Sequence, residues 1–183
     1  LYAVQSTSNW NLDITDGVMD GAYSYPDGAT GSGVDVYVVD TGVYVAHTEF
    51  GGRAIEGKDY ASSEPCDYQG VTYTEWDGHG THVAGTIGSG TFGIAKGVRI
   101  INVRVLDNCG YGDTDVATTA LRWIIRHHKA SRVGIVNMSF GAPADQSTVT
   151  LERAVADLLG DNLIPVVAAG NESSDACGSS PAN

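Results

Sequence analysis

Short runs of β-branched residues alternate along this chain with segments of helical periodicity, and this alternation constrains the fold more than any other feature. The runs cover residues 33–39, 99–106, 132–138 and 162–169. Two segments between them, 113–129 and 148–159, carry apolar residues at the spacing of amphipathic helices. Strand–helix–strand units of this length call for parallel crossovers. The predicted fold class is therefore α/β, a parallel β-sheet flanked by helices on both faces.

Length and charge narrow the class of protein further. The 183 residues suit one domain, and no internal repeat divides them. With 22 acidic against 10 basic residues the net charge is −12, so we expect no nucleic acid as a partner. No run of 18 apolar residues occurs, so we expect no membrane span. Leu1 opens no charged and apolar leader, and we expect any secretion signal to have been removed.

Two polar side chains stand where the chemistry of a parallel sheet gathers, beyond the carboxyl ends of its strands. Asp40 closes the run 33–39, and His79 lies in the glycine-rich segment 77–86, where we expect it to open a helix. An imidazole works as a base near neutral pH when a buried carboxylate fixes its tautomer. Each signal alone is weak, but together they predict a hydrogen-bonded pair of Asp40 and His79.

Asn171 follows the last predicted strand after three small residues. An asparagine amide can donate to the oxyanion of a tetrahedral intermediate, and loss of such a donor costs roughly 3 to 4 kcal/mol. Taken alone, however, Gly170-Asn171 is a turn signal. The segment 171–173 is also formally a glycosylation sequon, which we discount because a sugar there would block the cleft.

Two other interpretations of these motifs are weaker. His79 and His82 form an H-x-x-H pair that suggests zinc, but no H-E-x-x-H occurs, and we predict that His82 is a structural histidine on a buried helix. A dinucleotide-binding domain would need G-x-G-x-x-G after its first strand, and the sequence lacks it.

Three motifs in this order resemble those of the subtilisin-like serine peptidases: Asp40-Thr-Gly, the segment 79–85 and Ala168-Ala-Gly-Asn171. The segments 37–43, 103–107 and 137–141 are most similar to the proteinase K-like secreted branch. The resemblance covers nearly the whole chain. It implies a three-layer sandwich, incomplete in this chain, in which Asp40 orients His79, His79 acts as general base and then acid, and Asn171 donates to the oxyanion.

The resemblance also implies a cleft in which an extended polypeptide substrate adds as a strand between two edges. One edge is Gly110, Tyr111 and Gly112, and the other is Ser139, Phe140 and Gly141. The pocket for the side chain before the scissile bond would be lined by Ala168, Ala169 and Gly170, which implies a broad, apolar-leaning specificity. The family often has a tyrosine where this chain has Thr114, so the shape of the more distant apolar pocket is left open.

The nucleophile of the family, in a Gly-Thr-Ser-Met-Ala motif downstream of the oxyanion asparagine, does not occur in these residues. Ser139 lies on the matched binding edge and Ser179 precedes no helix, so neither replaces it. We therefore interpret residues 1–183 as the N-terminal part of one peptidase domain, inactive by itself. A C-terminal segment or second chain would supply the serine of a secreted endopeptidase. The alternative is a pseudoenzyme of the same fold that binds peptides without cleaving them.

Three cysteines, an odd number, leave open either one thiol with a partner elsewhere or three reduced thiols. Relatives in the proteinase K-like branch link the two regions that contain Cys66 and Cys109, so the resemblance implies that disulfide. Cys177 would then pair with a cysteine beyond Asn183.

No organic cofactor is expected, but the resemblance implies structural calcium in the complete protein. Asp13, Asp16 and Asp20 surround Gly17 in an oxygen-rich loop of the kind that suits calcium, as in some relatives. Solvated aspartates in an acidic protein are the alternative. A second calcium site is expected near the segment 180–182, completed by residues beyond Asn183.

Overall fold

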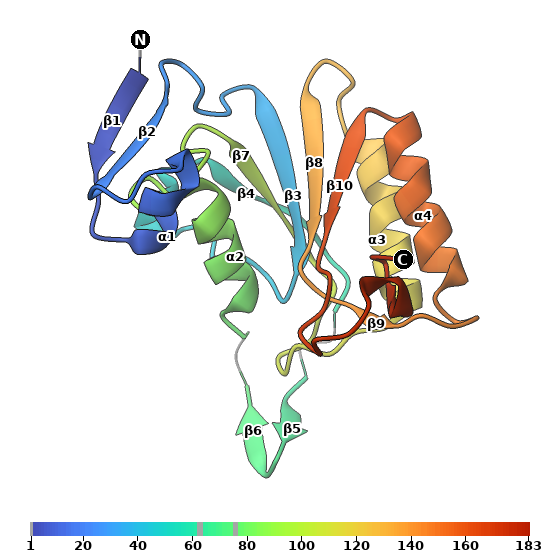
Figure 1. Ribbon diagram of the computed structural model, residues 1–183. Helices are drawn as coiled ribbons and strands as arrows, with labels where there is room; N and C mark the ends of the chain where they lie inside the picture. Colours follow the sequence, from blue (N-terminus) through green and yellow to red (C-terminus); the bar gives the residue numbers. More distant parts are fainter. Residues whose placement is uncertain (1, 62–63, 75–76) are drawn as a thin grey trace.

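A five-stranded parallel sheet forms the centre of the computed structural model, which describes residues 2–61, 64–74 and 77–183 (Figure 1). Its strands lie in the order β10-β8-β3-β7-β4, and every neighbouring pair is parallel. Their bounds are β3 (Val34–Asp40), β4 (Ala54–Asp59), β7 (Arg99–Arg104), β8 (Val133–Met138) and β10 (Leu163–Val167). Strand β3, the first strand of this sheet along the sequence, therefore lies in its middle, with Asp40 at the carboxyl end of the strand.

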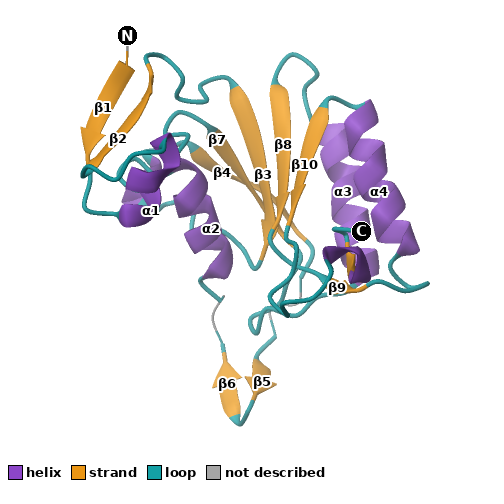
Figure 2. Cartoon of the chain, in the orientation of Figure 1, coloured by secondary structure: helices purple, strands orange, loops and turns teal. Residues whose placement is uncertain are grey.

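Helices cover both faces of the sheet, as the alternation of patterns predicts (Figure 2). Helix α2 (His79–Gly88) lies on one face, and α3 (Thr114–His127) and α4 (Val149–Gly160) lie together on the other. The alternation of side chains along β3 supplies both interfaces. Val36 and Val38 belong to the core cluster under α2, whereas Tyr37 and Val39 belong to the cluster under α3 and α4.

The two larger helices begin and end close to their predicted bounds for local reasons. Helix α3 starts after Asp113, whose carboxylate accepts a hydrogen bond from the backbone N–H of Asp115 and so caps the first turn. It ends where His128 takes an extended conformation. All four predicted strands and both predicted helices are thus confirmed, and α2 begins at His79 as expected.

The sequence patterns missed β4 of the central sheet. They also missed several short elements. These are a hairpin of β1 (Tyr2–Ser6) and β2 (Ala22–Pro26), a hairpin of β5 (Cys66–Tyr68) and β6 (Val71–Tyr73), the pair β9 (Ala142–Pro143) and β11 (Ser179–Ser180), and the short helical turns α1 (Trp10–Asp13), η1 (Ile14–Asp16), η2 (Thr48–Phe50) and η3 (Ala176–Gly178). The β5–β6 hairpin projects beyond the carboxyl-end edge of the sheet (Figure 1).

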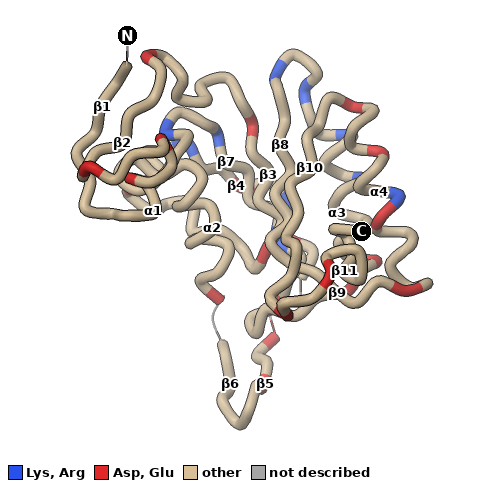
Figure 3. Tube along the Cα trace, viewed as in Figure 1, with Lys and Arg blue, Asp and Glu red and all other residues tan. Residues whose placement is uncertain are grey.

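Several acidic residues lie at or beyond that same edge (Figure 3). Asp40 and Asp59 end their strands there, and Asp67, Asp77 and Asp107 lie in the segments beyond. Among the described residues, no helix has the length and apolar character needed to cross a membrane.

Candidate active site

Asp40 and His79, which are far apart in the sequence, are in direct contact. The distance from His79 Nδ1 to Asp40 Oδ1 is 2.8 Å. A carboxylate oxygen can only accept, so Nδ1 carries the proton and Nε2 is left as an acceptor. The Asp40 side chain is fully buried, while the His79 side chain is 49% exposed. The pair thus leaves Nε2 of His79 as a basic ring nitrogen, and the buried Asp40 carboxylate fixes the tautomer of the imidazole.

Thr41 joins the end of β3 to the start of α2. Its backbone N–H donates to Asp40 Oδ1 at 2.7 Å, and its hydroxyl accepts from Gly80 N–H and donates to the carbonyl of Asp77, both at 3.0 Å. Asp77 in turn accepts from the backbone N–H of His79 at 2.7 Å. One turn therefore fixes the Asp40 carboxylate and the first residues of the histidine helix together.

Gly80 makes this close approach possible. A Cβ atom at this position would lie 2.4 Å from the Gly42 carbonyl oxygen and 3.1 Å from Asp40 Oδ1. These distances leave no room for a side chain. Position 80, directly after His79, therefore requires glycine, because the backbone of α2 touches the turn that follows Asp40.

Two buried polar residues of β7 support this turn, and the sequence analysis did not identify either. Asn102 accepts from Val43 N–H at 3.0 Å through its side-chain oxygen, and Arg104 donates from Nε to the Thr41 carbonyl at 3.0 Å. Both are almost fully buried. The signal was present in the sequence, because an asparagine and an arginine interrupt an otherwise apolar strand.

Asn171 lies four residues beyond the end of β10, at the same edge of the sheet as Asp40. The chain continues beside β8 past the strand, where Ala168 N–H donates to the Met138 carbonyl at 3.2 Å. Asn171 is exposed, and its backbone N–H donates to Glu172 Oε2 at 2.7 Å. Its side-chain amide makes no hydrogen bond within the described part of the chain, so both N–H groups are available to a ligand.

The structure brings two of the predicted substrate-binding segments to one cavity. Gly110, Tyr111 and Gly112 line it from one side, and Phe140 and Gly141 from the other; its volume is about 150 Å³. Ser139 does not line this cavity, and its hydroxyl accepts from the Asn137 side chain at 2.9 Å. Ala168, Ala169 and Gly170 do not line it either, and they lie partly or fully exposed after β10.

The predicted disulfide between Cys66 and Cys109 is present, with the two Cα atoms 6.1 Å apart. It joins the β5–β6 hairpin to the loop that carries Gly110 to Gly112. In the same region the rings of Tyr68 and Tyr111 lie 5.9 Å apart. Cys177 is free and exposed, so its predicted partner stays a prediction.

The three N-terminal aspartates accept hydrogen bonds from the backbone of their own loop. Asp13 Oδ1 accepts backbone N–H groups from residues 20, 21 and 22, and Asp16 accepts from Val18 and Ser24. Asp20 accepts from the N–H of residue 22. No group of three potential metal ligands is found among the described residues. In this structure these carboxylates cap the backbone of the loop before β2, and the assignment of Asp13, Asp16 and Asp20 as metal ligands stays a prediction.

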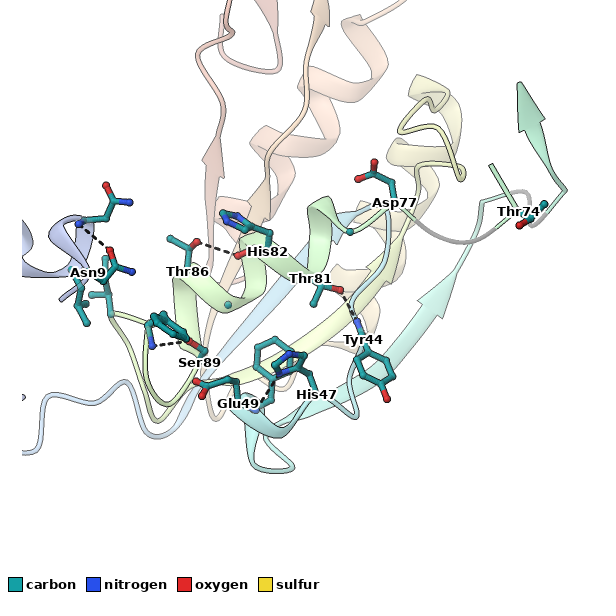
Figure 4. A pocket seen from close by; sticks show the side chains of 17 residues that line it. Asn9, Tyr44, His47, Glu49, Thr74, Asp77, Thr81, His82, Thr86 and Ser89 are labelled. Carbon is teal, nitrogen blue, oxygen red and sulfur yellow. Dashed lines mark hydrogen bonds between the residues drawn. The ribbon is translucent and has the colours of Figure 1, made fainter. Parts of the chain in front are cut away.

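His82 also differs from its prediction, because it is exposed rather than buried. The buried face of α2 consists of Gly80, Ala84 and Gly88, and a residue two positions after Gly80 points away from it. His82 instead lines a wide cavity of about 1010 Å³ on α2, together with His47 and Glu49 (Figure 4). This cavity does not include Asp40, His79 or Asn171 in its lining.

Comparison with known proteins agrees with this geometry. The family described as "Subtilase family" matches residues 31–183. The "Extracellular serine proteinase" of Thermus sp. (strain Rt41A) is 44% identical over 99% of this chain and 42% of its own length, and "Proteinase T" of Parengyodontium album is 38% identical over 100% of this chain and 60% of its own. A crystal structure of a cold adapted subtilisin-like serine proteinase superposes with a TM-score of 0.80 at 34% identity, covering 96% of this chain and 61% of that one. The chain thus spans less than two thirds of the length of these relatives.

Proposed function

Because the chain belongs to the subtilase family, we propose that the complete protein is a secreted serine endopeptidase of broad, apolar-leaning specificity. The observation that carries the proposal is the 2.8 Å contact of His79 with the fully buried Asp40. The relative named above supports the location, since its name states that it is extracellular. A cysteine pair joined in a disulfide is also in keeping with an oxidising compartment.

In the proposed mechanism, His79 Nε2 removes the proton of a serine hydroxyl as that oxygen attacks the substrate carbonyl carbon. Asp40 keeps Nδ1 protonated and stabilises the imidazolium that forms. Asn171 donates from its side-chain amide to the oxyanion of the tetrahedral intermediate. His79 then returns the proton to the leaving amine, and the acyl-enzyme is hydrolysed by the same steps with water as the nucleophile.

The nucleophilic serine comes, in this proposal, from residues outside these 183, in a C-terminal segment or a second chain. Among the serines of the matched cleft, Ser139 already accepts a hydrogen bond from Asn137 and stands on the proposed binding edge. The share of the relatives that this chain spans is in keeping with a nucleophile located elsewhere.

The proposed substrate is an extended polypeptide lying between the edges 110–112 and 139–141. The cavity between them is lined by apolar groups such as Leu106 and Phe140, which supports a preference for an apolar substrate side chain in this cavity. Recognition through backbone hydrogen bonds would be largely independent of substrate sequence. Ala168, Ala169 and Gly170 form the proposed wall for the residue before the scissile bond.

Structural calcium in the complete protein remains part of the proposal, with Asp13, Asp16 and Asp20 as one candidate set of ligands. In this structure their carboxylates accept hydrogen bonds from backbone N–H groups. Ligands for calcium near residues 180–182 would have to include residues outside this chain.

The test is cleavage of a fluorogenic peptide library by the full-length protein and by its His79→Ala variant. We expect hydrolysis by the wild type and a loss of at least about 10²-fold in kcat in the variant. Unchanged hydrolysis by the variant would exclude His79 as the base. Saturable binding of the same peptides without any cleavage by the wild type would instead identify a pseudoenzyme.

A further inference from the structure

Arg104 is the largest fully buried side chain among the described residues, and it carries a charge at the catalytic edge of the sheet. Its relative exposure is 0%. A buried guanidinium is costly unless its donors are satisfied, so a position of this kind needs a reason. We infer that Arg104 is a positioning residue that fixes the Asp40–His79 pair through Thr41. This inference rests on the proposed function.

The register of the sheet places Arg104 between two carboxylate-bearing positions. On β7, Arg104 is the register partner of Asp40 on β3 and of Asp59 on β4. Its guanidinium NH1 lies 3.2 Å from Asp59 Oδ2. Asp59 on β4 therefore balances the positive charge of Arg104 from the side away from β3. The Nε atom of Arg104 is directed toward Thr41, at the end of β3.

On the catalytic side the contact is with a backbone carbonyl rather than with a carboxylate. Nε donates to the Thr41 carbonyl oxygen at 3.0 Å. The N–H of Thr41 donates to Asp40 Oδ1, and its hydroxyl bonds both Gly80 N–H and the Asp77 carbonyl. Displacement of Thr41 would therefore disturb the aspartate and the first turn of the histidine helix at the same time.

A third contact extends the effect to the proposed substrate edge. Arg104 NH2 donates to the side-chain oxygen of Asn108 at 2.9 Å, and the Asn108 amide donates to the Glu64 carbonyl at 3.2 Å. Asn108 is buried and directly precedes Cys109 of the disulfide. One guanidinium thus connects the end of β3, the end of β4 and the loop leading to residues 110–112.

The experiment compares Arg104→Met and Arg104→Lys with a matched control in the full-length protein. Arg99 is the control because it lies on the same strand and pairs with a buried carboxylate, Asp35, but at the opposite end of the sheet. Arg99→Met should change kcat by less than about twofold. For Arg104→Met we expect kcat to fall by about 10- to 100-fold, since a displacement near 1 Å costs that much.

Arg104→Lys should show an intermediate loss, because an ammonium keeps the charge but cannot serve three partners in fixed directions. If Arg104→Met does not fold, as judged by near-UV circular dichroism, Arg104→Lys decides the question. A folded Arg104→Met variant, or failing that Arg104→Lys, with the wild-type kcat would overturn the inference.

A second readout does not depend on catalysis and separates this inference from the proposed function. The proton between His79 Nδ1 and Asp40 can be observed in the low-field NMR spectrum of the full-length protein. We expect its resonance to shift or disappear in Arg104→Met and Arg104→Lys, but to stay unchanged in Arg99→Met. An unchanged resonance in both Arg104 variants would overturn the positioning role even if the wild type cleaved no peptide.

Discussion

Replacement of Gly80 by alanine is a sharp perturbation of the proposed site. The new methyl carbon would stand 2.4 Å from the Gly42 carbonyl oxygen and 3.1 Å from Asp40 Oδ1. Ordinary contact between carbon and oxygen begins near about 3.4 Å, so the backbones of α2 and the turn must separate by about 1 Å. Because the nearer neighbour is a backbone atom and Asp40 Oδ1 is held by two hydrogen bonds, the helix itself has to move.

The expected result is a loss of kcat by about 10- to 100-fold, since His79 moves with the helix and away from Asp40. Stability should fall by about 1 to 3 kcal/mol as a result of overpacking. The assay is peptide hydrolysis by the full-length protein, together with urea unfolding of the same preparation.

Gly85 provides the control on the same helix. A Cβ at position 85 meets nothing within 4 Å, so Gly85→Ala should stabilise the helix by up to about 1 kcal/mol with unchanged kcat. Wild-type kcat in Gly80→Ala, or an equal loss in both variants, would refute the argument that close packing of α2 on the turn sets the His79 geometry.

Three further predictions concern stability. Hydrogen bonds from the N–H and hydroxyl of Thr91 lower the pKa of Glu49, so its carboxylate stabilises the fold above its unfolded-state pKa and loses this effect as the pH falls through its folded-state pKa. Glu49→Gln should therefore lower the free energy of unfolding by about 0.5 to 1 kcal/mol at neutral pH and leave it unchanged at about pH 2, as measured by urea unfolding at both pH values. Loss of the disulfide in Cys66→Ser/Cys109→Ser should cost up to about 4 kcal/mol for its separation of 43 residues, and an unchanged denaturation midpoint would contradict its structural role. Asp13→Ala should lower the free energy of unfolding equally with calcium or with a chelator, because its carboxylate accepts hydrogen bonds from backbone N–H groups. A loss of stability seen only with calcium would support the assignment of Asp13 as a metal ligand.

Four of the five strands of the central sheet and its two large helices could be predicted because both hydrophobic periodicities are strong there. Tyr37 and Val38 lie on opposite faces yet are both buried, which is the reason that the run 36–39 is continuously apolar. The hairpins were missed because their strands are short and largely exposed. The burial pattern of β6, for example, shows no inward-facing position.

The contact of Asp40 with His79 could be predicted from the position of each residue at the end of a strand and the start of a helix. The hydrogen-bond roles that could not be predicted depend on the course of the backbone. Counting carboxylates near Gly17 could not show that the N–H groups of residues 20–22 and 24 occupy Asp13 and Asp16. Arg104 was missed because hydrophobic periodicity shows only which residues of one strand face the core. The role of Arg104 depends on contacts with residues at the ends of other strands and in the loops that follow them.

The most direct test of the account is to map the adduct of a fluorophosphonate on the full-length protein by mass spectrometry of its peptides. The account predicts one modified serine outside these 183 residues, modified about 10²- to 10⁴-fold more slowly in His79→Ala. An adduct on Ser139 or Ser179, or a rate that does not depend on His79, would contradict it.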